Sequence, residues 1–238
     1  MISTAAVIDL GDAIVDAAIK SLAELGGPDV QQAFAYDLAH AASAVATARS
    51  LLDYGAKGDT EARIACAFTA DVLHDLAGKI LGRETLWGVA PGALEGASQF
   101  IAQYRDPDFL ASLAEASGPL HLTDDMDMVR DTFRAFAQDV IAPHAEHVHR
   151  TNGDVPEEII TGLAELGAYG LSVPAEYEGF SEGGHDEYVA MVVATEELSR
   201  ASLGIGGSLI TRPEILTRAL VKGGTEAQKH KWLPKLAA

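Results

Sequence analysis

Apolar residues recur every three or four positions along almost the whole chain, and this helical periodicity constrains the fold more than any other feature. The apolar stripes are separated by short stretches rich in glycine and proline, the residues that most strongly interrupt regular structure. Alternation with a period of two, which is typical of strands, is nearly absent. The sequence therefore predicts an all-α protein.

The first half of the chain, residues 1–120, is predicted to be a helical extension. Helices are expected over residues 3–25, 29–54, 59–80, 93–103 and 107–116. Asp59 is the residue expected to cap the third of these helices, because its carboxylate can accept a backbone hydrogen bond. Ser117, Gly118 and Pro119 then interrupt the pattern, so we place a domain boundary near residue 120.

The second half, residues 121–238, is predicted to be a separate helical domain. Thr123 is a predicted N-cap followed by three aspartates, and Pro156 fits the first position of a later helix. Thr225 and Gln228 have the spacing of a capping box, which predicts a last helix. A loop over residues 171–184 leads to a helix through residues 188–198, and another helix is expected over residues 209–221.

Charge and composition exclude several classes of function. The formal net charge of -18, without a long basic run, disfavours nucleic acid and anionic membranes as partners. No apolar stretch approaches the roughly 20 residues that cross a bilayer, and the first residues lack the features of a signal peptide. The single cysteine, Cys66, cannot form an internal disulfide. We expect a cytoplasmic protein with neither nucleic acid nor membrane as a partner.

Common catalytic and metal-binding motifs are missing from the sequence. It contains no phosphate loop, nucleophile elbow, zinc helix or dinucleotide-binding glycine turn. His144, His147 and His149 cluster near Glu146, but His149 projects away from the other two on a continuing helix, so no metal site is predicted. Cys66 lies in an apolar stripe without a neighbouring base, which favours a packing role.

Arg212 is the most informative single residue, because a cation followed by Pro213 lies where the helical pattern is poor. A fixed guanidinium at such a break can bind a carboxylate or phosphate with two hydrogen bonds. The alternative is an ion pair with Glu214 or with a neighbouring domain. The residues alone leave both possibilities open.

From about His121 onward, the sequence resembles the N-terminal domain of acyl-CoA dehydrogenases. The resemblance is carried by three stretches in order: DVIAPHAEHVHRTNGDVPEEIITGLAELGAYGLSVPAEYEGF, VATEELSRASLGIGGSL and GGTEAQKHKWLPKLAA. In that family the domain is an all-helical layer that packs against FAD and covers one side of the acyl pocket. A β domain and a C-terminal helical bundle follow it, and this sequence ends before both.

The resemblance implies that the full-length protein is an FAD-dependent enzyme, with an acyl-CoA as substrate and an electron-transferring flavoprotein as oxidant. It implies a homo-oligomer when full length. The family's glutamate base lies in the absent part, so no catalytic residue is assigned and the 238-residue chain alone is predicted to be inactive. No cofactor-binding residue is assigned either.

The helical extension narrows the resemblance to the methylsuccinyl-CoA dehydrogenase subgroup, which oxidises (2S)-methylsuccinyl-CoA to mesaconyl-CoA. That substrate carries a free carboxylate, so Arg212 is predicted to bind it, with Ser208 and Thr211 as further substrate-binding residues. The alternative function is a non-catalytic helical binding or assembly module derived from the same family.

Overall fold

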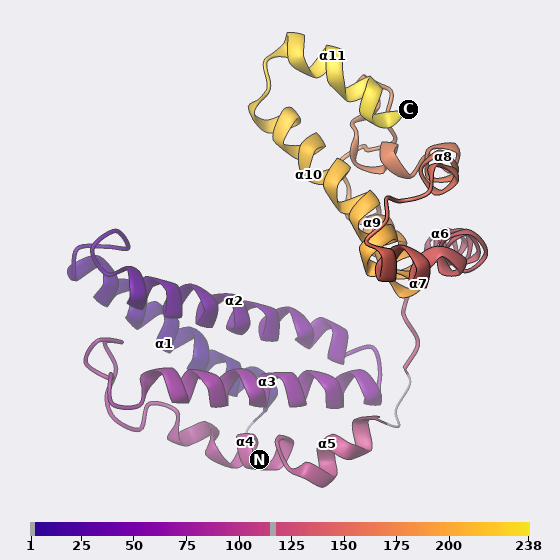
Figure 1. Ribbon diagram of the computed structural model, residues 1–238. Helices are drawn as coiled ribbons and strands as arrows, with labels where there is room; N and C mark the ends of the chain where they lie inside the picture. The colour runs from indigo at the N-terminus through magenta and orange to yellow at the C-terminus, as the bar shows by residue number, and fades with distance from the viewer. Residues whose placement is uncertain (1–2, 115–117) are drawn as a thin grey trace. The chain divides into compact units, whose positions relative to one another are not determined.

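The computed structural model describes residues 3–114 and 118–238, which are almost entirely helical (Figure 1). The predicted all-α fold is confirmed: the described residues contain no strand, only an isolated bridge between Pro174 and Ser181. The chain divides into two compact units, Met1–Leu120 (unit 1) and His121–Ala238 (unit 2). Ser117, which the sequence places at the boundary, and the predicted helix end at residue 116 lie outside the described residues.

Unit 1 is built on three long helices that pack side by side, with two shorter helices laid against the third (Figure 1). Its elements are α1 (Thr4–Glu24), α2 (Gln32–Gly55), α3 (Asp59–Ile80), a 3₁₀ turn (Glu95–Ala97), α4 (Ser98–Tyr104) and α5 (Pro107–Ala114). One apolar core runs through the unit, because each long helix buries a single apolar stripe. Trp87 is fully buried in it and meets the Phe34 ring edge-on at 5.4 Å.

Two helix starts in unit 1 differ from the sequence prediction. α2 begins at Gln32 rather than residue 29, because a turn intervenes in which the backbone N–H groups of Val30 and Gln31 donate to Gly27. Gly58, not Asp59, is the N-cap of α3. Asp59 is instead the first residue of the helix, where its carboxylate still faces the positive end of the helix dipole.

Unit 2 consists of shorter helices joined by irregular turns. Its elements are α6 (Asp124–Phe136), a π-helical turn (Ala137–Ile141), α7 (Ala142–Thr151), α8 (Glu157–Glu165), 3₁₀ turns (Ala168–Ser172 and Ala175–Tyr177), α9 (His185–Ala201), a second π-helical turn (Leu203–Gly207), α10 (Ser208–Gly223) and α11 (Glu226–Ala237). α9 packs against α6, and α10 packs against α11 (Figure 1).

The helix caps of unit 2 follow the sequence closely. The Thr123 hydroxyl accepts a hydrogen bond from Met126, and the capping box of Thr225 and Gln228 is complete. Pro156 is the N-cap of α8 rather than its first residue, a difference of one position. These local signals fix where the helices of unit 2 begin.

The core of unit 2 is held by an ion pair as well as by apolar contacts. Glu197 on α9 is only 2% exposed, and both its carboxylate oxygens accept hydrogen bonds from Arg134 on α6, at 2.7 and 3.0 Å. Arg200 adds a third hydrogen bond at 3.2 Å. The hydrogen bond from Arg134 holds the pKa of Glu197 below its usual value, with burial opposing it. The pair fixes the contact between α6 and α9.

A tight loop precedes α9 and is fixed by backbone contacts. Val173 accepts a hydrogen bond from Ser181, and Gly179 lies so close to the Val173 carbonyl oxygen that a β carbon at position 179 would overlap it. The Glu187 carboxylate closes the loop by accepting hydrogen bonds from the Ser181 hydroxyl and the Gly183 N–H, each at 2.9 Å. A loop bound at so many points is expected to be rigid.

No helix among the described residues is both long enough and apolar enough to span a bilayer. The helix predicted over residues 209–221 is confirmed, but the poor helical pattern around Arg212, which indicated a break, does not interrupt it. Instead α10 runs without interruption from Ser208 through Pro213 to Gly223. The irregularity lies just before it, in the π-helical turn Leu203–Gly207.

Candidate functional site

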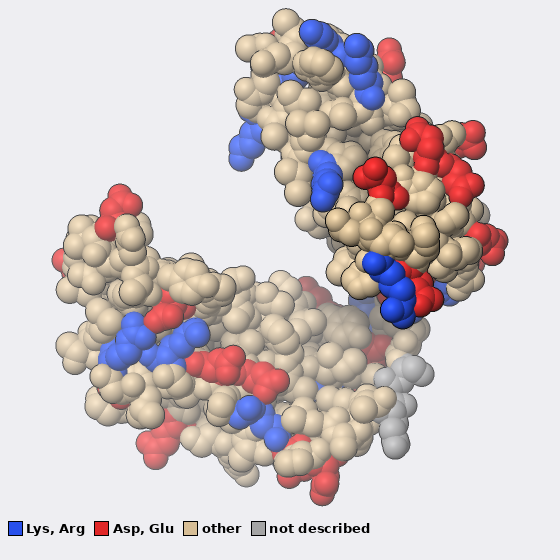
Figure 2. Space-filling view, in the orientation of Figure 1, with Lys and Arg blue, Asp and Glu red and all other residues tan. Residues whose placement is uncertain are grey.

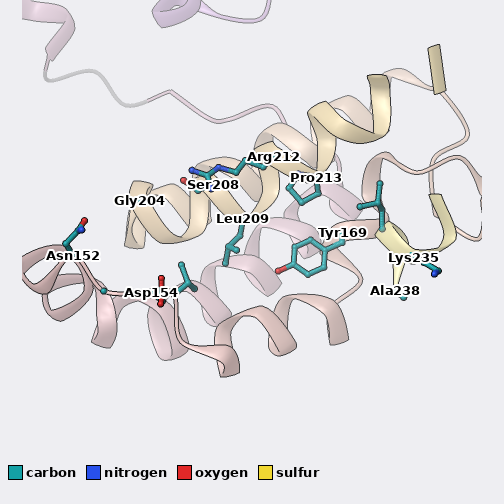
Figure 3. Close-up of a pocket in the computed structure, with 13 residues that line it drawn as sticks. Asn152, Asp154, Tyr169, Gly204, Ser208, Leu209, Arg212, Pro213, Lys235 and Ala238 are labelled. Atoms are coloured by element: carbon teal, nitrogen blue, oxygen red, sulfur yellow. The ribbon is translucent and has the colours of Figure 1, made fainter. Parts of the chain in front are cut away.

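A cleft of about 740 Å³ lies within unit 2, between α10, the loop after α7, the 3₁₀ turn at Tyr169 and the end of α11 (Figure 3). Its wall is formed by Asn152, Gly153, Asp154, Val155, Tyr169, Gly204, Ser208, Leu209, Arg212, Pro213, Lys235, Leu236 and Ala238. Backbone, apolar and charged groups all contribute to this wall, a mixture that is typical of ligand sites. We refer to it as the cleft.

The turn between α9 and α10 sets the position of the cleft's α10 wall. The Ser202 hydroxyl accepts a hydrogen bond from Ile205 at 3.2 Å and so begins the π-helical turn. A β carbon on Gly206 would lie 2.5 Å from the Leu198 carbonyl oxygen, so only glycine allows this close approach. The glycines therefore let α10 start directly against the end of α9.

The opposite wall depends on the end of α7 and on Tyr169. Asn152 adopts a left-handed backbone conformation, φ 51°, which ends α7 and turns the chain into the loop that lines the cleft. The Tyr169 hydroxyl donates to the Ile160 carbonyl at 3.4 Å. Burial, assisted by the charge of Glu157, raises the pKa of Tyr169, so it remains a neutral hydrogen-bonding group.

Basic and acidic side chains are distributed unevenly over unit 2. α10 and α11 carry most of the Lys and Arg of unit 2, whereas the helices before them are mainly acidic (Figure 2). Arg212 and Lys235 line the cleft, and neither makes an ion pair with any carboxylate in the described part of the chain. Asp154 is the carboxylate residue in the wall.

Glu214, the alternative partner that the sequence offered for Arg212, is engaged elsewhere. It pairs with Arg218 one turn further along α10. The Arg218 guanidinium also lies over the Tyr188 ring, 5.4 Å from its centroid. The ion pair between Arg212 and Glu214 is therefore not formed, and the guanidinium of Arg212 remains available at the cleft.

The three residues predicted to bind substrate have different positions. Ser208 and Arg212 both line the cleft and lie one helical turn apart on α10 (Figure 3). Thr211 is not part of the wall, and its hydroxyl donates to the Gly207 carbonyl within the helix. The structure thus places Ser208 and Arg212 in the same wall of the cleft, and Thr211 outside that wall.

Sequence reasoning did not single out Tyr169, Lys235 or the loop Asn152–Val155, all of which line the cleft. These residues come from three separate elements, and their meeting depends on how α11 and the 3₁₀ turn pack against α10. Asn152 carried the one usable signal, since asparagine followed by glycine after a helix favours a left-handed cap.

One of the three histidines on α7 contacts a carboxylate on the next helix. His144 Nε2 lies 2.8 Å from a Glu158 carboxylate oxygen. Within residues 3–114 and 118–238, no group of three His, Cys, Asp or Glu side chains is arranged to hold a metal ion. The interaction joins α7 to α8.

Comparison with protein families assigns unit 2. The family model described as "Acyl-CoA dehydrogenase, N-terminal domain" matches residues 123–238. This part of the chain belongs to the acyl-CoA dehydrogenase family. The match begins at the Thr123 cap of α6 and covers every element that forms the cleft. The cleft is therefore a feature of the acyl-CoA dehydrogenase N-terminal domain of this chain.

Individual relatives agree with this assignment. The (2S)-methylsuccinyl-CoA dehydrogenase of Cereibacter sphaeroides is 43% identical over 141 residues, 59% of this chain and 24% of that protein. The mitochondrial isovaleryl-CoA dehydrogenase of Arabidopsis thaliana is 35% identical over 127 residues, 52% of this chain and 30% of that protein. The mitochondrial 2-methylacyl-CoA dehydrogenase of Solanum tuberosum is 36% identical over 125 residues, 52% of this chain and 29% of that protein.

The chain spans less than a third of the length of these relatives. The alignment with the Cereibacter sphaeroides protein, at 141 residues, is longer than unit 2 and so extends into unit 1. Part of the extension is therefore shared with that relative.

Proposed function

We propose that the chain is the N-terminal part of a flavin-dependent acyl-CoA dehydrogenase, which forms a double bond between the α and β carbons of an acyl-CoA thioester. The family of unit 2 and the names of its relatives support this proposal. In such an enzyme FAD would supply the oxidising chemistry, and both FAD and the base for the α proton would be held by parts outside this chain. The chain's own contribution is to bind and orient the acyl group.

FAD itself does not fit the cleft as the chain presents it. Its diphosphate needs several converging backbone N–H groups or cations, whereas the described wall offers two cations from different helices, Arg212 on α10 and Lys235 on α11. We therefore assign no FAD-binding residue to this chain. In the full-length enzyme the cofactor would be held mainly by the parts that the relatives have beyond this match.

For the substrate we propose a short branched acyl-CoA with a free carboxylate, of which (2S)-methylsuccinyl-CoA is the example. The observation that carries this proposal is the Arg212 guanidinium, which lines the cleft without a carboxylate partner among the described residues. A buried carboxylate needs a cation to replace its lost hydration, and arginine can supply two parallel hydrogen bonds. The Ser208 hydroxyl on the same face of α10 can donate a third.

Thr211, the third predicted binding residue, has a smaller proposed part. Its hydroxyl proton is used by the Gly207 carbonyl, so it can offer a ligand only lone pairs. A carboxylate needs donors, and we therefore assign its recognition to Arg212 and Ser208. Thr211 would keep the first turn of α10 in register beneath them.

The test uses the full-length enzyme and compares two substrates of similar size, methylsuccinyl-CoA and isovaleryl-CoA. Arg212→Ala should lower kcat/KM for methylsuccinyl-CoA by roughly 10- to 100-fold, the loss expected for one charged hydrogen-bonded contact. Isovaleryl-CoA, which has no carboxylate, should lose less than about threefold. Arg218→Ala is the matched control, since Arg218 is on the same helix but outside the cleft. Equal losses on both substrates would exclude the carboxylate role of Arg212.

The second function, a non-catalytic helical module, is favoured by one observation: unit 1 is a complete helical core of its own. We propose that residues 1–120 serve assembly of the full-length homo-oligomer. Removing residues 1–118 from the full-length enzyme should lower the oligomer mass measured by light scattering. An unchanged mass would exclude the assembly role. Visible absorption separates the dehydrogenase from a non-catalytic binding or assembly module derived from the same family, because a competent enzyme is yellow and bleaches when acyl-CoA reduces it, with an electron-transferring flavoprotein restoring the colour.

A further inference from the structure

A second pocket lies within unit 1, where the irregular chain between α3 and α4 meets the end of α3. Its volume is about 300 Å³, which is within the size range of small-molecule sites. Ile80, Leu94 and Ile101 give it a largely apolar wall. We refer to it as the unit 1 pocket.

Glu84 and Glu95 also line this wall. The Glu84 carboxylate accepts a hydrogen bond from the Gly82 N–H at 3.2 Å. A β carbon on Gly92, another residue of the wall, would lie 3.5 Å from a Glu95 carboxylate oxygen. Within residues 3–114 and 118–238, neither carboxylate forms an ion pair. The unit 1 pocket therefore combines an apolar wall with two negative charges that no cation compensates among those residues.

The helix that ends at the pocket adds to its negative potential. The last residue of α3 is Ile80, so the negative end of the helix dipole lies at the pocket. Of the cations nearest in sequence, Arg83 donates to Asp37 at 2.7 Å, and Lys79 does not line the pocket. The charge of the unit 1 pocket is thus complementary to a cationic ligand.

The shape of the wall favours a small molecule over a protein partner. Among the described wall residues, Leu81 is the one large apolar side chain that is well exposed, at 79%. Ile80 and Leu94 are almost fully buried, so little of their surface is available outside the pocket. A stable interface between proteins needs a much larger exposed apolar patch.

We propose that the unit 1 pocket binds a small amphipathic cation, a primary alkylammonium ion. Its alkyl chain packs against Ile80, Leu94 and Ile101, and its ammonium group donates hydrogen bonds to the carboxylates of Glu84 and Glu95. Each methylene group that the pocket buries should raise the affinity by up to about fourfold. The site lies wholly in unit 1, so it is independent of the function proposed for the cleft.

The test uses the 238-residue chain and the probe hexylammonium, with 1-hexanol and hexanoate as its neutral and anionic counterparts. Binding is followed by the methyl signals of Ile80, Leu94 and Ile101 in NMR spectra of ¹³C-labelled protein. Hexylammonium should shift these signals with a dissociation constant in roughly the millimolar range. Hexanol should bind about 10-fold more weakly, and hexanoate should be the weakest ligand. Butylammonium should lose about 5- to 15-fold relative to hexylammonium.

Variants separate the charged and the apolar parts of the site. Glu84→Gln/Glu95→Gln should weaken hexylammonium by about 10-fold and leave hexanol within about twofold. The matched control is Glu24→Gln/Asp53→Asn, which removes two charges from unit 1 outside the pocket and should change neither affinity. Ala93→Leu should fill the pocket and weaken both ligands, with the unfolding temperature showing that unit 1 remains folded.

Four outcomes would overturn the proposal. Hexylammonium could give no saturable shift of the three methyl signals, or bind no better than hexanol. An equal loss in the control variant would mean that the net charge of the chain, rather than the pocket, attracts the probe. Unchanged binding in a folded Ala93→Leu variant would place the ligand elsewhere. Shifts of the same signals with protein concentration alone would show that a second copy of the chain covers the pocket.

Discussion

Unit 1 and unit 2 are both helical, but they differ in regularity. The three main helices of unit 1 run for 21, 24 and 22 residues around one apolar core, whereas the longest helix of unit 2 has 17. Unit 2 adds two π-helical turns, prolines inside α10 and α11, and a charge pair in its core. The cleft lies among these irregular features, which suggests that the three main helices of unit 1 are built for stability and unit 2 for substrate recognition.

The two tryptophans make this comparison measurable, because Trp87 lies in unit 1 and Trp232 in unit 2. When one tryptophan is replaced by phenylalanine, the fluorescence of the other reports the unfolding of its own unit alone. In the following predictions, unit 1 is followed in the Trp232→Phe background and unit 2 in the Trp87→Phe background.

The largest effect is expected in unit 1. Leu73→Ala, at a site 1% exposed, should lower the free energy of unfolding of unit 1 by about 3–5 kcal/mol, because the cavity in so regular a core cannot collapse fully. Urea unfolding read by Trp87 measures it. Leu81→Ala is the control, since that side chain is 79% exposed and should change little. An equal shift in the Trp232 signal would mean that the units unfold together, and the comparison would fail.

The next effect concerns the charge pair of unit 2. Arg134→Ala leaves the buried Glu197 carboxylate with the more exposed Arg200 as its remaining partner, and should lower the free energy of unfolding of unit 2 by less than Leu73→Ala lowers that of unit 1. Urea unfolding read by Trp232 measures the loss. The control is Arg150→Ala, which removes an exposed pair with Glu146 on α7. Similar small losses in both variants would show that the core of unit 2 depends on apolar packing alone.

Acid should weaken unit 2 through Glu197 and Glu187. The hydrogen bond from Arg134 lowers the pKa of Glu197, and that from the Glu182 N–H lowers the pKa of Glu187, from an ordinary value of 4.5. A carboxyl group with a lowered folded pKa stabilises the fold fully above its unfolded pKa and loses that contribution as the pH falls. The unfolding temperature of unit 2 should therefore decrease between about pH 5 and about pH 3.

The control for this pH dependence is the double variant Glu187→Gln/Glu197→Gln, which cannot bind the two protons. Its unfolding temperature should start lower and decrease less over the same range. If its slope equals that of the wild type, the two carboxyl groups do not cause the acid sensitivity of unit 2.

The smallest effect is expected on the surface of unit 1. Arg49 on α2 pairs with Asp9 and Asp12 on α1, but all three side chains are well exposed. Arg49→Ala should therefore cost unit 1 no more than about 1 kcal/mol, and this loss should shrink in high salt. A loss as large as that of Leu73→Ala would show that charges, rather than the apolar core, hold the helices of unit 1 together.

The fold could be predicted from sequence wherever the deciding interactions are local. The caps at Thr123 and Thr225 involve residues three positions apart, and the apolar stripes of unit 1 follow from helical periodicity alone. Errors of one residue occur at Gly58 and Pro156, where the cap depends on backbone geometry rather than on a side-chain signal.

The cleft was only partly predictable, for a physical reason. Arg212 stood out because a cation next to proline in a glycine-rich segment is unusual, and Ser208 lies one turn away on the same helix. Tyr169 and Lys235 reach the cleft only because the 3₁₀ turn and α11 both pack on α10. Contacts between segments so far apart in the chain produce no pattern of fixed spacing in the sequence. The poor helical pattern around Arg212 did not mark a break, because Pro213 lies inside α10 and the irregular π-helical turn ends just before that helix begins.

The contact between Gly179 and the Val173 carbonyl has an evolutionary consequence. Every codon change that replaces this glycine adds at least a β carbon, and the rigid loop has no space for one. Selection at this codon should therefore be nearly absolute in any lineage that keeps the loop, whatever acyl group its enzyme accepts. Position 179 is thus a natural internal standard for a mutational scan, against which tolerance at the cleft residues can be calibrated.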